Sequence, residues 1–157
     1  MGIEIERKFL VLGDDWRQSA GPPSLLCQAY LSNDERASIR VRTDDAGGAF
    51  LTIKSAQAGT ARSEFEYPIP HDEALQLLEL RTGSLVDKRR HRIAHEGHVW
   101  EIDEFTGDNE GLVIAEIELK DAGEAFAKPS WAEREVTGEV QYFNASLARL
   151  PFRQWGR

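Results

Sequence analysis

Charged residues recur two positions apart along this chain, a spacing that puts both side chains on one face of a β-strand. The first case is Glu4, Glu6 and Lys8, which alternate with Ile3 and Ile5. Two carboxylates on one strand face lie about 6.6 Å apart, and at an effective dielectric near 20 they repel each other by about 2–3 kcal/mol. Water would tolerate that repulsion, so this stretch alone does not distinguish a solvated strand face from a binding site.

The same alternation returns in later stretches, with the two signs of charge on different ones. Basic faces carry Arg40 with Arg42, Lys54, and Lys88 with Arg90 and Arg92, whereas acidic faces carry Glu64 and Glu66 beside Arg62, Glu101 with Asp103, and Glu116 with Glu118. A solvated face usually mixes Lys and Glu with uncharged polar residues. The segregation therefore favours a site with an acidic and a basic sector.

Two arrangements of these faces agree with the alternation. If the charged faces point outward, the apolar faces fill the interior of a small barrel, as on many half-solvated sheets. If they point inward, the apolar outer surface needs helices to cover it. Leucine-rich helical sequence is available for that purpose, but strand parity alone leaves both arrangements open.

If the charged faces converge, their chemistry defines the ligand. The acidic set offers oxygen ligands for a hard divalent cation, and it consists of Glu4, Glu6, Glu116, Glu118 and Asp103. The basic set offers donors for phosphoryl oxygens, and it consists of Lys8, Arg40, Arg42, Lys54, Lys88 and Arg90. A linear triphosphate would match both sets, whereas a single phosphate would leave buried cations unpaired at considerable cost.

The elements that must position these residues are mostly strands. Strand-like runs cover about 3–11, 25–32, 37–43, 49–55, 61–69, 85–93, 98–105 and 112–120, with turn residues such as "QAGT" (57–60) between them. Short connections between eight strands predict an antiparallel barrel or a strongly curved sheet. The stretch "PHDEALQLLELRTG" predicts an external helix with Asp72 as N-cap and Gly83 as its stop. Shorter helices are predicted at Asp14–Ser19, Asp121–Phe126 and Asn144–Leu150.

Composition limits the class of protein. The 157 residues are expected to form one domain (1–157), with 41% apolar and 29% charged residues. A net charge of −8 argues against a nucleic-acid partner. Cys27 is the single cysteine, which excludes an internal disulfide and a thiolate zinc cluster. No run approaches the roughly 18 apolar residues of a membrane helix, so we expect a soluble cytoplasmic protein without a membrane partner.

Eight short motifs occur in a characteristic order: "EIERK", "QAYL", "IRVR", "TIK", "RSEFE", "DKRR", "EIDEF" and "AEIEL". In this order they closely resemble the CYTH family, the triphosphate tunnel metalloenzymes, over about residues 3–150. The resemblance implies an α+β fold, in which an eight-stranded antiparallel closed β-barrel has a charged interior and a few helices packed outside. It also implies that the acidic set binds metal and that the basic set, joined by Arg62, binds triphosphate. One departure is that Gln141 and Phe143 stand near the C-terminus, in a stretch where the family often has basic residues.

The resemblance implies metal-dependent hydrolysis of inorganic triphosphate (tripolyphosphate) to pyrophosphate and phosphate, with Mg²⁺ or Mn²⁺ as cofactor. The family also contains class IV adenylate cyclases, thiamine and nucleoside triphosphatases, and polyphosphate-handling domains. A cyclase or another triphosphatase is therefore an alternative of the same fold, and a non-catalytic polyphosphate or triphosphate sensor is one of another class. A homodimer is possible by family analogy.

The general base has three interpretations. Lys88, crowded by other cations, would have a lowered pKa and accept a proton, with Tyr30 holding it by a hydrogen bond. Glu64 or Glu66 would serve as a base or bind a second metal. A purely structural ion pair between these two carboxylates and Arg62 is the third reading.

Histidine and tryptophan are expected to play structural parts. His91, His95 and His98 span a strand end and a turn, where they would point in different directions, so surface histidines are expected rather than a metal site. The four tryptophans, at positions 16, 100, 131 and 155, are expected to be packing residues.

Overall fold

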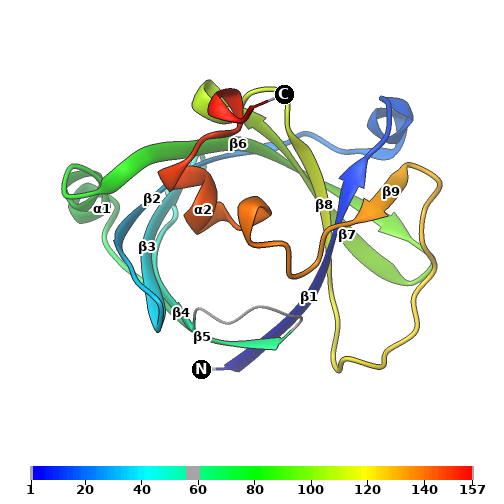
Figure 1. Cartoon of the computed structure of the whole chain (residues 1–157), viewed down its shortest axis with the longest axis horizontal. Coiled ribbons are helices and arrows are strands. Elements are labelled where there is room, and N and C mark those ends of the chain that lie inside the picture. The colour runs from blue at the N-terminus through cyan, green and yellow to red at the C-terminus, as the bar shows by residue number, and fades with distance from the viewer. Residues whose placement is uncertain (1, 56–60, 157) are drawn as a thin grey trace.

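The residues that the structure describes form one sheet of nine strands, whose course is drawn in Figure 1. The computed structural model describes residues 2–55 and 61–156. The strands are β1 (Gly2–Val11), β2 (Ser24–Asn33), β3 (Ala37–Asp44), β4 (Ala49–Ser55), β5 (Ala61–Pro68), β6 (Thr82–His95), β7 (His98–Thr106), β8 (Val113–Glu118) and β9 (Ala132–Glu135). The eight predicted strands are confirmed, while the short β9 was not predicted. The turn expected at 57–60 lies outside the described residues.

Eight strands close into an antiparallel barrel because β1 pairs with a strand on each side. The order around the sheet is β5-β4-β3-β2-β6-β7-β8-β1, and β1 also pairs with β5. The register joins Glu4 to Arg62 of β5 and Glu6 to Glu118 of β8. Beyond the end of β5, β9 pairs with the last residues of β1, with Phe9 opposite Glu135. Closure leaves the barrel strands without a free edge.

Helix α1 (His71–Leu78) lies outside the barrel, as predicted. It buries Ala74 and Leu78 against outward-facing Ala29 and Val41 of β2 and β3. Two details of the prediction were wrong. The N-cap is Pro70, and Asp72 instead lies in the first turn, where its negative charge faces the positive end of the helix dipole. The helix ends at Leu78, and Gly83 belongs to β6.

Helix α2 (Asn144–Arg149) lies within one end of the barrel, in contrast to the expectation that the helices pack outside (Figure 1). Its Leu147 and Ala148 are buried against Val86 of β6 and Phe105 of β7. Val86 lies two positions before Lys88, and Phe105 two positions after Asp103, so each shares a strand face with a charged residue. The inward face is therefore apolar at one end, and α2 fills that end.

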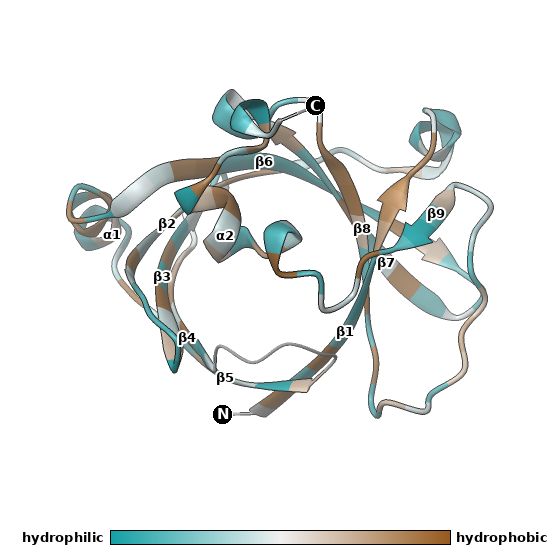
Figure 2. Cartoon of the chain, in the orientation of Figure 1, coloured by the Kyte–Doolittle hydropathy of each residue, from teal (hydrophilic) through white to brown (hydrophobic). Residues whose placement is uncertain are grey.

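The apolar outer faces are covered by short segments as well as by α1. Figure 2 shows apolar and polar residues alternating along the strands. The 3₁₀-helix η1 (Asp15–Ser19) places Trp16 on this surface, and Phe126 and Trp131 pack there against Trp100. The helix predicted at Asp121–Phe126 was wrong, because this covering segment consists of turns and extended chain. The remaining 3₁₀-helices are η2 (Gly107–Asn109), η3 (Val140–Tyr142) and η4 (Phe152–Gln154).

The tryptophans are packing residues, as predicted. Trp16 and Trp100 are buried, and Trp131 and Trp155 lie against apolar clusters. Within residues 2–55 and 61–156, no helix has the length and apolarity needed to cross a membrane.

Gly83 should be the most sensitive glycine of the barrel, because two constraints meet there. Its φ is +73°, and a Cβ would lie 2.5 Å from the carbonyl oxygen of Ala148 in α2. Gly97 has a φ of +84° but open space around it, so Gly97→Ala isolates the backbone strain. In urea unfolding we expect Gly97→Ala to lose about 1 kcal/mol and Gly83→Ala about 2–4 kcal/mol. Equal losses would contradict the close approach of α2 to β6.

Candidate functional site

A cavity of about 260 Å³ lies inside the charged end of the barrel. Predicted residues that line it are Glu4, Glu6, Lys8, Tyr30, Arg42, Lys54, Arg62, Arg90, Glu116 and Glu118. The inward arrangement of the charged faces, left open by strand parity, is therefore the one that the structure adopts. Glu64, Glu66, Arg40, Lys88 and Asp103 do not line the cavity themselves but contact residues near it.

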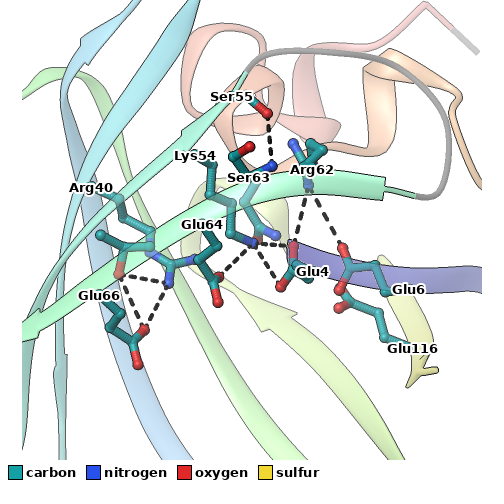
Figure 3. Close-up of polar contacts among 12 residues, drawn as sticks. Glu4, Glu6, Arg40, Lys54, Ser55, Arg62, Ser63, Glu64, Glu66 and Glu116 are labelled. Atoms are coloured by element: carbon teal, nitrogen blue, oxygen red, sulfur yellow. Dashed lines mark hydrogen bonds and ion pairs between the residues drawn. The ribbon is translucent and has the colours of Figure 1, made fainter. Parts of the chain in front are cut away.

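The seam between β1 and β5 joins acidic and basic side chains directly (Figure 3). Lys54 Nζ lies 2.8 Å from Glu4 Oε1 and 3.5 Å from Glu64 Oε2. Arg62 lies 3.6 Å from Glu6 and 4.0 Å from Glu4. The structural interpretation of Glu64 and Glu66 as partners of Arg62 was wrong, because Arg62 turns to the carboxylates of β1 instead.

Two arginines of β3 each have a buried donor atom without a hydrogen-bond partner among the described residues. The Nε atoms of Arg40 and Arg42 make no hydrogen bond to any described residue. Both guanidinium groups lie 3.8–3.9 Å from Glu66, and Arg40 also donates to Thr52 Oγ1 at 3.2 Å. Burial, followed by repulsion from Arg40 and Arg90, lowers the pKa of Arg42. Positive charge is thus concentrated here beyond what Glu66 neutralises.

The opposite wall of the cavity concentrates carboxylates. Burial and the nearby charge of Glu6 raise the pKa of Glu116. Burial and the charges of Glu4, Glu64 and Glu101 raise the pKa of Glu118. The repulsion that raises these pKa values would be relieved by a bound cation.

The donor chemistry of this wall fits a hard divalent metal, since it consists of crowded carboxylate oxygens. Among the residues that the structure describes, however, no three acidic, histidine or cysteine side chains are grouped as a metal site. The reason is visible at Glu4 and Glu6, whose oxygens face Lys54 and Arg62. Glu4 and Glu6 are therefore suitable ligands whose oxygens face cations of the protein in this structure.

Asp103 differs from the other predicted metal ligands because it does not line the cavity and two basic residues contact it closely. Arg90 binds it through two hydrogen bonds of 2.8 Å, and Lys88 Nζ lies 3.0 Å from Oδ2. The charges of Arg90 and Lys88 overcome the effect of burial and hold the pKa of Asp103 well below its usual range. Asp103 thus neutralises two buried cations.

Lys88 is buried, and its ammonium group is held in place from two sides. Burial lowers its pKa to about 8 against the opposing attraction of Asp103, and Arg90 adds to the lowering. Its Nζ donates to Asn144 Oδ1 at 3.1 Å. The hydroxyl of Tyr30, which lines the cavity, accepts a 3.4 Å hydrogen bond from Gln28. The expected hydrogen bond between Tyr30 and Lys88 is absent among the described residues.

Sequence reasoning left several cavity residues out of the site. Arg92 and Glu101 line it, and both share the parity of predicted site residues, so the alternation was a signal for them. Phe143 and Asn144 also line it, but they come from the segment that enters the barrel with α2. No strand pattern could place that segment inside.

The histidines lie away from the cavity. His91 is buried beside Trp16 and lies 3.3 Å from Glu104, so the expectation of a surface position was wrong for it. His98 is half-buried and lies 2.7 Å from Glu124. His91 packs against Trp16 of η1, and His98 contacts Glu124 in the segment that covers Trp100, so both play the structural part that was expected of them.

Removing the negative charge of Asp103 should destabilise the protein strongly. Asp103→Asn would leave Lys88 buried without its close counter-charge and Arg90 with Glu101 alone, 3.3 Å away, and we expect a loss of about 3–5 kcal/mol in urea unfolding. Glu139→Gln is the control, because Glu139 pairs with Arg134 in an exposed contact of 2.8 Å. That change should cost less than about 1 kcal/mol. Similar losses in the two variants would show that Asp103 does not stabilise buried charge.

Comparison with known proteins relates the whole chain to one family. The CYTH domain matches residues 2–150. A protein of Acetivibrio thermocellus named inorganic triphosphatase is 45% identical over 156 residues, covering 99% of both chains. One of Nitrosomonas europaea with the same name is 36% identical over 92% of this chain and 96% of its own. The crystal structure of the inorganic triphosphatase NE1496 has a TM-score of 0.65 at 31% identity, covering 92% of this chain and 96% of that one. This chain therefore belongs to the CYTH domain family.

Proposed function

We propose that this protein hydrolyses inorganic triphosphate to pyrophosphate and phosphate with the help of Mg²⁺ or Mn²⁺. The observation that carries the proposal is the pair of buried, unpartnered Nε donors on Arg40 and Arg42, next to a cavity that also contains crowded carboxylates. A phosphoryl oxygen is a suitable acceptor for such donors. The names of the relatives at 45% and 36% identity support the same reaction.

The size of the cavity favours a small inorganic substrate. Pockets for drug-sized ligands usually measure roughly 300–1,000 Å³, whereas this cavity measures about 260 Å³. A nucleoside or thiamine group would have to remain outside it. We therefore place inorganic triphosphate ahead of nucleoside and thiamine triphosphates, and ahead of the cyclase reaction, which requires an adenine site.

The basic set would bind the substrate from several strands at once. Lys8, Lys54 and Arg62 lie near the seam of the barrel, while Arg42 and Arg90 approach from β3 and β6. Because these groups surround the cavity, a linear polyanion could contact all of them, and one phosphate could not. Arg40 does not line the cavity but adds positive charge close to Arg42, 3.8 Å from Glu66.

We assign the metal to Glu4, Glu6, Glu116 and Glu118. When bound, a divalent cation would neutralise charge on the phosphoryl oxygens and lower the pKa of a nearby water. Asp103, although predicted as a further ligand, is better suited to orient Lys88 and Arg90, because it contacts both of them and does not line the cavity. Positioning and electrostatic stabilisation would supply most of the acceleration.

Lys88 is our proposed proton acceptor. A pKa of about 8 leaves part of the lysine neutral near neutral pH, and a base works best when its pKa is close to the working pH. Asn144 would orient the amine, and Tyr30 would face the attacking water from the cavity wall. Glu64 and Glu66 are the competing candidates for a base or second metal ligand, but each faces a cation.

The expected homodimer and cytoplasmic location stay predictions of the sequence.

Phosphate release decides between the proposed reaction and its alternatives. We expect orthophosphate from triphosphate with Mg²⁺ or Mn²⁺, none with EDTA, and slower release from ATP and thiamine triphosphate, because the cavity excludes their organic groups. Formation of cyclic AMP from ATP would identify a cyclase instead. Binding of triphosphate without turnover under every metal condition would identify a sensor.

The pH dependence of turnover tests Lys88 as the base. Only the neutral amine accepts a proton, so kcat should rise as the pH increases through about 8. Lys88→Ala should lower kcat by about 10²–10⁴-fold and remove this rise. Arg89→Ala is the control, because Arg89 is exposed and faces Glu104 outside the barrel. A Lys88→Ala enzyme that kept both its rate and its pH profile would exclude Lys88 from proton transfer.

A further inference from the structure

Phe143 brings an aromatic ring to two cations of the cavity. The ring centroid lies 4.8 Å from Cζ of Arg62 and 5.3 Å from Nζ of Lys8. Both distances are within the roughly 6 Å over which a cation is attracted to an aromatic ring. Phe143 also lines the cavity, so the ring contacts the two cations at the place where a substrate would meet them.

The carboxylates around these two cations hold them only loosely. Lys8 Nζ lies 3.7 Å from Glu116 and 3.9 Å from Glu6, and Arg62 lies 3.6 Å from Glu6. These separations exceed hydrogen-bonding distance. Within the described residues, neither cationic group has a closer acidic partner. The ring is therefore a substantial part of what fixes their positions.

The backbone of Phe143 is anchored to helix α2. Its carbonyl oxygen accepts hydrogen bonds of 2.9 Å from the amides of Ser146 and Leu147, at the start of α2. Leu147 is fully buried in the apolar end of the barrel. The side chain thus projects from the segment that is anchored by α2 toward the charged end.

An aromatic ring holds a cation differently from a carboxylate. It attracts the cation through its quadrupole but carries no net charge, so the cation remains available for an anionic ligand. Glu6 and Glu116, in contrast, compete directly with the substrate for the same ammonium and guanidinium groups. A ring at this place fixes the geometry of the cations without neutralising them.

We propose that Phe143 is a positioning residue for substrate binding, which holds Lys8 and Arg62 toward the triphosphate. The inference rests on the proposed function, which supplies the polyanionic substrate. Because Lys8 and Arg62 bind charge already present in the ground state, loss of the ring affects KM more than kcat.

Substitutions that change the ring electronically provide the test. Phe143→Leu keeps an apolar side chain without a π face, and we expect KM for inorganic triphosphate to rise about five- to tenfold with kcat within about twofold. Phe143→Tyr keeps an aromatic ring, so its KM should stay close to that of the wild-type enzyme. Incorporation of mono-, di- and trifluorophenylalanine at position 143 should raise KM stepwise, because fluorine withdraws density from the ring face while its shape barely changes. Urea unfolding of each variant checks that the fold is retained.

Two results would overturn the inference. One is a KM that is unchanged in Phe143→Leu, and the other is a fluorinated series without a trend, which would leave Phe143 as a packing residue. Calorimetric titration of inorganic triphosphate in the presence of Mg²⁺ separates this failure from failure of the proposed function. If the wild-type protein binds without turnover, the function is wrong and the Kd series decides on Phe143. If it neither binds nor hydrolyses triphosphate, both proposals fail.

Discussion

Charges enclosed in a barrel require counter-charges, and this constraint governs the interior of the protein. A buried ion without a partner costs several kcal/mol. The interior answers with ion pairs between strands: Lys54 with Glu4 across the closing seam, and Lys88 and Arg90 with Asp103 on the neighbouring wall. The balance is incomplete in two places. Arg40 and Arg42 keep unpartnered donors, while Glu116 and Glu118 have raised pKa values. These opposite imbalances are what a polyanion and a cation would satisfy together.

The second constraint is that one inward face must serve both an apolar and a charged end. Along β6 the inward residues change from Val86 to Lys88 and Arg90. The change explains why α2 lies inside the barrel: its Leu147 covers the apolar end. Because Asn144 at the start of the same helix receives the hydrogen bond from Lys88, the packing of the helix and the geometry of the site depend on each other.

The sequence predicted correctly which face of a strand each charged side chain lies on, but it did not predict the contacts that these side chains make across strands. The reason is physical. Period-two alternation identifies which side chains of one strand share a face, as Glu4 and Glu6 do on the cavity side of β1. It does not reveal which residues lie opposite one another across strands. The register places Arg90 opposite Asp103, and this pairing, rather than strand parity, directs the carboxylate to Arg90 and Lys88. Similarly, the close approach of Gly83 to α2 depends on tertiary packing, so a glycine after a helical pattern was interpreted as a helix stop.

The ion pairs that stabilise the interior also oppose the proposed substrate. Lys54 and Arg62 face Glu4 and Glu6 in this structure, so a triphosphate must attract them away from these carboxylates. The carboxylates released in that exchange would then repel the incoming phosphates, unless a cation accompanied the substrate. On the proposed function, a divalent metal that accompanied the triphosphate would bind these carboxylates, so that the acidic and the basic residues would each exchange their present partner for a new one of opposite charge. Phe143 lowers the cost of this exchange for Lys8 and Arg62, because the ring holds the two cations in place without neutralising their charge.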